Sequence, residues 1–382
     1  QLETLVIVLH PDINSRSFTG STAKTSLQAS ESRLEMETKF TPLESGIGGA
    51  LIGLSALVAY QADGKIIGIS GIVGPFLKSV MKCDLASQLW KFVFTLGLIL
   101  GGLINYFFNA PFAFPGPAPF TMARYVVAGF AIGVGTRFQR GCTSGHGICG
   151  LPRFSKRSWF AVPGFMLFAG LVVYLIRHTM QIGALEKTGI APLEWPPSWE
   201  FPLCAVGASL LLAVLSFAPL RAHRVVCPLA AGIICGLGLG VSGMTSQGKV
   251  LNFLDVAGYW DPSLAFVMGC GIMVSFPAFY MAEAEDAKPR CAESFEKPSK
   301  TGDYGTLAVG AVLFGIGWGL VGICPGPGLA GFVPYLLSSS PAGYGFALCT
   351  LLIPITWVIA DLALSTEGLA LQGSDQKPLL KK

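Results

Sequence analysis

Long apolar runs alternate with short polar clusters along most of this chain. A helix needs about 20 predominantly apolar residues to cross about 30 Å of hydrocarbon, and several runs approach that length. The pattern therefore predicts an all-α polytopic membrane protein with about nine transmembrane helices. The expected crossings lie near residues 46–60, 88–108, 122–138, 159–177, 201–218, 226–244, 262–281, 303–322 and 343–364.

The two ends of the chain do not share this pattern. Residues 1–44 are rich in Ser, Thr and Glu, and they lack the apolar segment and small-residue cleavage site of a signal peptide. We predict a flexible polar N-terminal tail over 1–44 and a C-terminal tail over 367–382. The membrane part between them is expected to divide into a first half over 45–224 and a second half over 225–366.

The division into halves depends on two weak internal matches that occur in the same order. GGALIG and ADGKIIG, within residues 48–68, resemble GIICG and SQGKVLN, within residues 232–252. GVG and GCTSG, within residues 133–145, resemble GIG and ICPGP, within residues 315–327. Five predicted crossings separate equivalent elements, and an odd number gives the elements opposite orientations in the membrane. We therefore expect two inverted repeats.

All four repeat motifs interrupt an apolar run with Gly, Pro or polar residues. Unpaired backbone groups cannot face lipid, so such breaks must be buried in protein or line a wet cavity. We expect broken or re-entrant helices that meet at a central constriction. Helix N-termini at the breaks favour an anion, and Lys65, Lys249 and Arg140 add positive charge nearby. Snorkelling toward the interface is an equally open role for the two lysines.

Cys142 and Cys324 occupy equivalent positions in the two halves. Cys142 lies in RGCTSGHG, where small residues permit close backbone approach and Thr143 and Ser144 can donate hydrogen bonds to an anion. Cys324 lies in GICPGPG, whose prolines cannot continue a helix interior. The paired occurrence favours a functional role for both thiols over simple packing.

Other side chains near these motifs are weaker candidates for a functional role. His146 is a candidate general base or proton shuttle, but no carboxylate lies close to it in the sequence, so we expect a packed or hydrated imidazole beside the pathway. Cys235 resembles an ordinary buried packing residue, and so does Cys149, although Cys149 can also face the same cavity as Cys142.

Composition and charge narrow the classes of function. The chain is 52% hydrophobic and only 13% charged, which excludes an ordinary soluble domain. The net charge of +4 is spread over loops and gives no nucleic-acid footprint. We expect no bound metal and no cofactor, and no ATP-driven pumping by this chain, because zinc-type CxxC pairs and a GxxxxGK[ST] motif are missing.

Basic residues alternate between successive loops. They concentrate in loops such as 151–158 and 282–303, whereas the loops between them hold few bases, among them Arg124 and Arg177. Cytoplasmic loops of membrane proteins carry the excess of Lys and Arg. The pattern predicts an integral multi-pass protein with its C-terminus in the cytoplasm and its N-terminus outside.

The same strings carry a resemblance to a known family. RGCTSGHGICG at 140–150, CPGPGL at 324–329 and the Gly-rich two-half layout over 46–364 look like the YeeE/YedE sulphur-transport family. The resemblance implies an inverted-repeat fold pinched at its centre, where thiosulfate passes a short series of cysteines through S–H···S and S–H···O hydrogen bonds. Cys142 and Cys324 match two of these thiols. A further cysteine of the family, at the first break, is not present in YQADGK at 60–65.

We therefore predict a membrane permease for thiosulfate or a similar small sulfur-containing anion. The residues expected along its pathway are Cys142, Cys324, Thr143, Ser144, His146, Lys65, Lys249 and Arg140. The expected partners are the anion and membrane lipid, and docking of a soluble cytoplasmic sulfur-carrier protein is left open. One alternative is a membrane-embedded sulfurtransferase with Cys142 as persulfide carrier. Another is a structural membrane protein in which cysteines and glycines serve only helix packing.

Overall fold

The structure is a computed structural model that describes most of the membrane part of the chain. The described residues are 38–84, 88–114, 118–179, 190–191, 200–218, 222–258, 260–284, 287–301 and 303–375. Most of the predicted N-terminal tail lies outside them. The last helix continues to Asp375, beyond the predicted start of the C-terminal tail, and residues 376–382 lie outside the described part.

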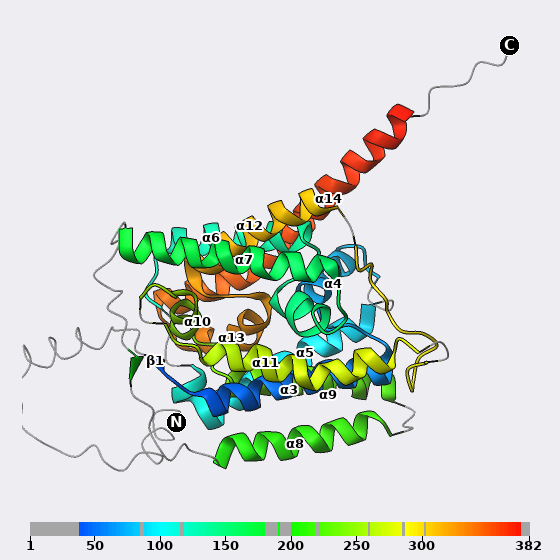
Figure 1. The fold of residues 1–382 in the computed structure, drawn as a ribbon, viewed down its shortest axis with the longest axis horizontal. Helices are drawn as coiled ribbons and strands as arrows, with labels where there is room; N and C mark the ends of the chain where they lie inside the picture. The colour runs from blue at the N-terminus through cyan, green and yellow to red at the C-terminus, as the bar shows by residue number, and fades with distance from the viewer. Residues whose placement is uncertain are drawn as a thin grey trace, which may run out of the picture.

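The described residues are mainly helical, and the long helices run side by side in a bundle (Figure 1). The long helices are α3 (Pro42–Asp63), α5 (Leu89–Ala113), α6 (Met122–Phe138), α7 (Lys156–Tyr174), α8 (Glu200–Ser216), α9 (His223–Val241), α11 (Ser263–Met281), α12 (Tyr304–Val321) and α14 (Pro341–Asp375). A two-residue strand, β1 (Thr38–Lys39), pairs in parallel with β2 (Ile190–Ala191) at one end of the bundle.

Each of the nine apolar runs singled out in the sequence forms one of these helices. Seven stretches of helix within the described residues are long and apolar enough to cross a membrane. Helices α6 and α8 have 17 residues each and are therefore about 25 Å long, slightly short of the hydrocarbon thickness. The all-α polytopic fold class predicted from the sequence is confirmed.

Four shorter elements lie at the breaks, and their extent was not predicted. They are α4 (Ile69–Met81), the π-helix η2 (Ser144–Gly150), α10 (Gln247–Leu254) and α13 (Pro325–Leu337). Each follows a long helix that ends close to a residue in the left-handed region. These residues are Gly64, Arg140, Gly243 and Gly322, with φ of 68°, 55°, 72° and 67°. The left-handed turn ends the long helix and lets the chain start a new one in another direction.

The helix pairs of the bundle follow a regular scheme. Helix α5 packs on α9, and α11 packs on α3; helix α6 packs on α14, and α12 packs on α7. Two further contacts, α3 with α9 and α6 with α12, join the two sets. In chain order, α3, α5, α6 and α7 of the first half match α9, α11, α12 and α14 of the second half. Under this matching, each of the contacts corresponds to another contact or to itself.

Glycines permit these close crossings. A Cβ on Gly49 of α3 would lie 2.3 Å from the Val267 carbonyl oxygen of α11, and one on Gly232 of α9 would lie 2.2 Å from the Phe94 carbonyl oxygen of α5. Such distances leave no room for a side chain, so the backbones touch directly, as small residues allow in membrane helix pairs. Large apolar side chains instead cover the outside of the bundle, for example Leu167, Leu211 and Met273.

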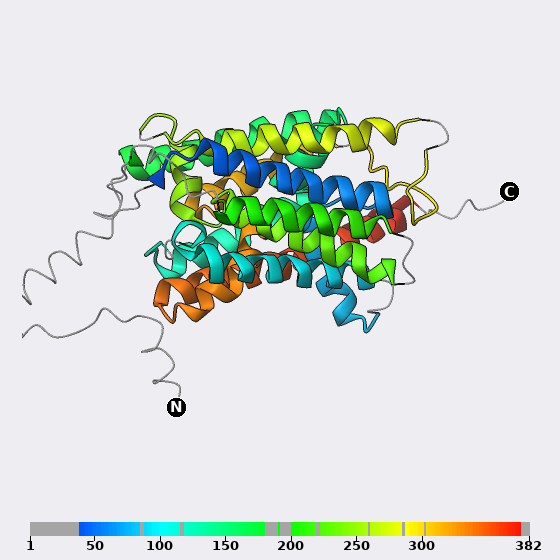
Figure 2. The same ribbon diagram turned by 90° about the horizontal axis from the view of Figure 1, so that it is seen from below.

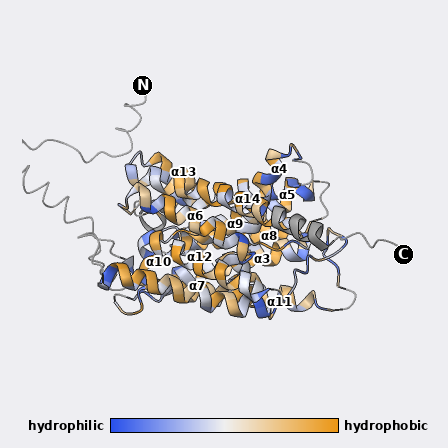
Figure 3. Cartoon of the chain, turned by 90° about the horizontal axis from the view of Figure 1, so that it is seen from above, coloured by the Kyte–Doolittle hydropathy of each residue, from blue (hydrophilic) through white to orange (hydrophobic). Residues whose placement is uncertain are grey.

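The two ends of the bundle differ in charge. Helix α3 starts beside β1 at one end, whereas α14 leaves from the opposite end (Figures 1 and 2). Apolar residues extend along the bundle and polar residues gather toward its ends (Figure 3). The loop between α11 and α12 lies at the α14 end and carries the bases Lys288, Arg290, Lys297 and Lys300.

Candidate functional site

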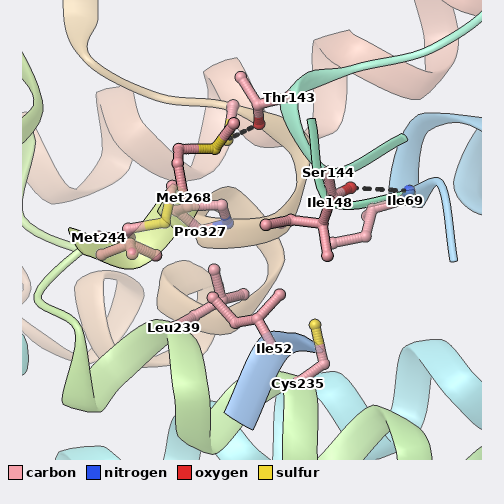
Figure 4. Close-up of a pocket in the computed structure, with 13 residues that line it drawn as sticks. Ile52, Ile69, Thr143, Ser144, Ile148, Cys235, Leu239, Met244, Met268 and Pro327 are labelled. Atoms are coloured by element: carbon pink, nitrogen blue, oxygen red, sulfur yellow. Dashed lines mark hydrogen bonds between the residues drawn. The ribbon is translucent and has the colours of Figure 1, made fainter. Parts of the chain in front are cut away.

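A small cavity lies at the centre of the bundle where the breaks of the two halves meet (Figure 4). Its volume is about 30 Å³, enough for about two water molecules. The residues that line it are Ile52, Ile69, Thr143, Ser144, Ile148, Cys235, Leu239, Met244, Val267, Met268, Cys324, Gly326 and Pro327. We call it the central cavity. Most of these residues are buried, so the cavity is closed in this conformation.

Three helix N-termini bring their first residues to this cavity. Ile69 begins α4, Ser144 begins η2, and Cys324 is the N-cap residue of α13. Met244 lies in the turn that leads into α10. The N-terminal end of a helix carries a partial positive charge, so this convergence favours an anion. Both halves of the chain contribute to the convergence.

Cys324 lines the cavity and accepts a hydrogen bond from a residue of the first half. The Thr143 hydroxyl donates a hydrogen bond to the Cys324 sulfur over 3.4 Å. The backbone N–H of Gly326 also faces this sulfur. Pro325 and Pro327 have no N–H groups, so Gly326 supplies the one backbone donor among the first three residues of this helix. The side chain of Cys324 is 3% exposed, which keeps the thiol away from bulk water.

Cys142 lies next to the cavity but is not one of its lining residues. Its sulfur and the Ser144 hydroxyl form a hydrogen bond of 3.3 Å. The Ser144 hydroxyl in turn accepts a hydrogen bond of 3.4 Å from the backbone N–H of Ile69, as Figure 4 shows. Ser144 therefore links the start of α4 to the start of η2. Cys142 contacts this serine but does not itself line the cavity.

A third and a fourth thiol lie close by. Cys235 of α9 lines the cavity and is within electrostatic range of Cys142, Cys149 and Cys324. Cys149 is not a lining residue, and its thiol donates a hydrogen bond to the Ile67 carbonyl oxygen at 3.5 Å. The expectation that Cys235 is only a packing residue therefore missed a lining position. Its place within the repeated glycine row, GIICG, was the signal that could have found it.

Two methionines complete the sulfur-rich wall. Met244 and Met268 lie on one side of the cavity, and Ile52, Leu239 and Cys235 lie below them in Figure 4. Methionine thioethers are polarisable and adapt to cavities of different shape. Neither methionine was predicted from the sequence, because each lies outside the motifs that were singled out.

The two repeat lysines do not reach the central cavity. Lys65 is partly exposed and forms an ion pair of 2.8 Å with Glu296. Lys249 is buried, donates to the Thr41 hydroxyl at 2.6 Å and lies 3.5 Å from Asp261. Both lysines already have partners at the two ends of the bundle, so neither supplies charge to the centre in this conformation.

His146 is buried, and both of its ring nitrogens are engaged. Nδ1 lies 3.0 Å from the Ser158 hydroxyl and Nε2 lies 3.1 Å from the Gln139 carbonyl oxygen. A carbonyl can only accept, so Nε2 carries the proton and Nδ1 accepts from Ser158. The imidazole therefore joins η2 to α6 and α7, and it does not bond to Cys142 in the described structure.

Arg140 lies outside the central cavity and lines a second one. This second cavity has a volume of about 240 Å³ and carries the bases Lys91, Arg140, Arg153 and Arg157. We call it the basic vestibule. It is also lined by His146, and by Gly68 and Gly145, whose chain neighbours Ile69 and Ser144 line the central cavity. Within the described residues no group of three or more His, Cys, Asp or Glu side chains is placed to hold a metal ion.

Comparison with known proteins connects this geometry to a family. A family model described as sulphur transport matches residues 5–173. A second model, a family of unknown function (DUF6691), matches residues 223–342. The first match falls in the first half of the chain and the second match in the second half, and each covers part of its half.

Three bacterial relatives are named "Probable transporter". One from Xylella fastidiosa strain 9a5c is 42% identical over 119 residues, which cover 30% of this chain and 81% of the relative. Another from that strain is 40% identical over 123 residues, covering 32% and 84%. One from strain Temecula1 is 43% identical over 108 residues, covering 28% and 72%. The chain therefore belongs to the YeeE/YedE sulphur-transport family and is a multi-pass membrane transporter.

Proposed function

We propose that this transporter is a permease that passes thiosulfate or a similar small sulfur-containing anion through the central cavity. The observation that carries the proposal is the hydrogen bond between Thr143 and Cys324, which joins residues 181 positions apart at the meeting point of the helix N-termini. Positive helix ends attract the oxyanion part of such a substrate. Thiols and thioethers are soft partners for its terminal sulfur.

Weak contacts suit transport better than tight binding. An anion must bind well enough to enter and loosely enough to leave. The thiols of Cys235 and Cys324 and the thioethers of Met244 and Met268 offer such contacts around the cavity. The cavity is closed in this conformation, so the helix starts around it must separate to let an anion pass.

We further propose that the two halves form inverted repeats. The support is the contact scheme, in which the pair α5 and α9 corresponds to the pair α11 and α3, and α6 and α14 correspond to α12 and α7. Five long helices, α3, α5, α6, α7 and α8, precede α9, which places equivalent helices in opposite directions if each crosses the membrane. Such symmetry lets one half open toward each side in turn.

The geometry gives less support to a sulfurtransferase. A Cys142 nucleophile needs a base within hydrogen-bond reach, and His146 was the candidate. The imidazole instead bonds to Ser158 and Gln139. The nearest hydrogen-bond partner of the Cys142 thiol is the Ser144 hydroxyl, which is no base at neutral pH.

Uptake of radiolabelled thiosulfate into proteoliposomes tests the proposal. We expect the wild-type chain to transport, and Cys324→Ala to lower the maximal rate at least tenfold because the thiol that faces the cavity is lost. Cys142→Ala is expected to have a similar effect through Ser144. Cys349→Ala is the matched control, since that cysteine is buried outside the cavity.

Correct folding is checked by size-exclusion elution and thermal unfolding of each variant. Absence of thiosulfate uptake by a folded wild-type chain contradicts the proposed substrate. Equal loss of uptake in Cys349→Ala contradicts the assignment of the pathway to the central cavity.

A further inference from the structure

The basic vestibule and the central cavity are separated by very little protein. Gly68 and Gly145 line the vestibule, and their chain neighbours Ile69 and Ser144 line the central cavity. A Cβ on either glycine would lie within 3.5 Å of the Cα of the other, so the two backbones touch. Because neither residue has a side chain, only backbone lies between α4 and η2 at this point.

The vestibule has an excess of positive charge. It is lined by Lys91, Arg140, Arg153 and Arg157, and Glu296 is its one lining acid among the described residues. Glu296 is already paired with Lys65 at 2.8 Å. The ion pairs formed within the described part of the chain include none of the four bases.

The guanidinium groups are held in place by neutral acceptors. Arg153 donates to the Pro298 carbonyl at 2.9 Å, and Arg157 donates to the Gln139 carbonyl at 3.1 Å. Carbonyl oxygens fix the direction of these side chains but do not cancel their charge. Arg140 lies within electrostatic range of Arg157, so the two cations repel each other. An anion between them would relieve that repulsion.

Two acidic residues near the vestibule already have hydrogen-bond partners of their own. A hydrogen bond from Lys300 holds the pKa of Glu283 below its usual range, so this carboxylate is ionised and already matched by a base. Asp303 caps α12 by accepting hydrogen bonds from the backbone N–H groups of Gly305 and Thr306. Glu283 lies within electrostatic range of Arg153 and Asp303 within that of Arg140, but neither carboxylate lines the vestibule.

One wall of the vestibule comes from the loop between α11 and α12. The backbone N–H of Glu296 donates to the Gly64 carbonyl at 2.8 Å, and that of Arg157 donates to the Lys300 carbonyl at 3.2 Å. The loop therefore bridges the end of α3 and the start of α7. The start of α7 adds the positive end of its helix dipole to the same wall.

The opposite end of the bundle does not repeat this arrangement. Its buried bases are compensated: Arg177 lies 3.0 Å from Asp255, and Lys249 lies 3.5 Å from Asp261. The excess of positive charge therefore adjoins the central cavity on one side only, within the described residues.

From these observations we propose that the basic vestibule is a second binding site, separate from the central cavity, for a small divalent oxyanion such as sulfate or thiosulfate. The site holds the anion on one side of the Gly68–Gly145 contact. The identity of the transported anion rests on the proposed function above, whereas binding of an oxyanion to the vestibule does not require transport.

Equilibrium binding of radiolabelled sulfate to the purified full chain in detergent tests this site. We expect Arg153→Gln combined with Arg157→Gln to weaken binding at least tenfold, because two charged donors are lost. Lys156→Gln is the matched control: this exposed neighbour of Arg157 does not line the vestibule, and wild-type affinity is expected. Cys324→Ala is also expected to keep sulfate binding.

A second variant keeps the proposal testable if the double variant misfolds. The Arg140 side chain is exposed, so Arg140→Gly removes one vestibule charge without opening the core, and we expect severalfold weaker binding. Wild-type affinity in a folded Arg140→Gly or in a folded double variant overturns the proposal. Equal weakening by Lys156→Gln also overturns it, because the effect would then be that of net charge.

Failure of the two proposals can be told apart. Sulfate binding with the expected variant pattern, but no thiosulfate uptake, keeps the vestibule and contradicts the proposed function. Thiosulfate uptake with variant-independent sulfate binding keeps the proposed function and overturns the vestibule.

Discussion

Arg140 has a backbone conformation that glycines have at the other three breaks. Its φ is 55°, compared with 68° at Gly64, 72° at Gly243 and 67° at Gly322. The left-handed region costs a residue with a side chain about 1 kcal/mol or more relative to glycine. A strained residue at a functional site is retained when its side chain is needed there. Of the four described non-glycine residues with positive φ, Cys83, Arg140, Phe154 and Ser339, only Arg140 lines the basic vestibule, and our proposal gives its guanidinium a role there.

Removing this strain leads to a testable expectation. Arg140→Gly should raise the free energy of unfolding by about 1 kcal/mol, because glycine adopts the turn without a steric penalty. Thermal unfolding of the purified protein in detergent measures the change. Arg137→Gly, within α6, is the control and should be destabilising, because it puts glycine in a helix and breaks the ion pair with Asp361. A destabilised Arg140→Gly would contradict the strain argument.

The helices of this bundle are positioned by backbone contacts between glycines. Gly101 of α5 lies against α9, where an added Cβ would be 2.5 Å from the Ile233 carbonyl oxygen and 2.9 Å from the Gly236 Cα. Carbonyl and Cα atoms in the middle of a helix cannot move aside as a flexible side chain can. The crossing of α5 and α9 therefore depends on the absence of a side chain at this position.

Gly101→Ala is expected to lower the free energy of unfolding by about 1–3 kcal/mol, since the methyl group overpacks the crossing. Gly207→Ala in α8 is the matched control, because an added Cβ there meets nothing within 4 Å. In that variant, better helix propensity should leave stability unchanged or slightly higher. Thermal unfolding of both variants side by side checks the expectation. Equal stability of the two would show that α5 and α9 separate easily.

At the scale of the whole molecule, the basic residues mark one end of the bundle. Cys83 follows α4 at that end and is exposed, whereas Val256 follows α10 at the other end and is 71% exposed. From the excess of bases, the positive-inside rule predicts that the Cys83 end lies in the cytoplasm. This orientation is a prediction, since the arrangement of helices alone is compatible with either.

Labelling from one side of the membrane tests the orientation. In a chain whose other accessible cysteines, Cys204, Cys270 and Cys291, are replaced by Ser, a membrane-impermeant maleimide added to intact cells should leave Cys83 unlabelled. Val256→Cys in the same background should be labelled. Permeabilised cells, in which both sites react, provide the control. The reverse pattern in intact cells would place the basic end outside.

The sequence alone determined where the long helices lie and where they break. Hydrophobic length is a local property, so each of the nine apolar runs could be located without knowing its neighbours. The glycines and prolines at the breaks are equally local signals, because they act on the backbone at their own positions. Cys324 and Thr143 were also found in this way, since both belong to motifs that interrupt an apolar run.

The side chains that meet at the centre could be identified only once the helices were seen packed together. Thr143 bonds to Cys324 over 181 positions, and Met268 reaches the same cavity from a helix without any motif. The contacts of Lys65 with Glu296 and of Lys249 with Thr41 span 231 and 208 positions. Such pairs form because long helices fold back on each other and bring distant breaks together. The motifs predicted that the breaks meet, but no local pattern of residues records which side chains face each other there.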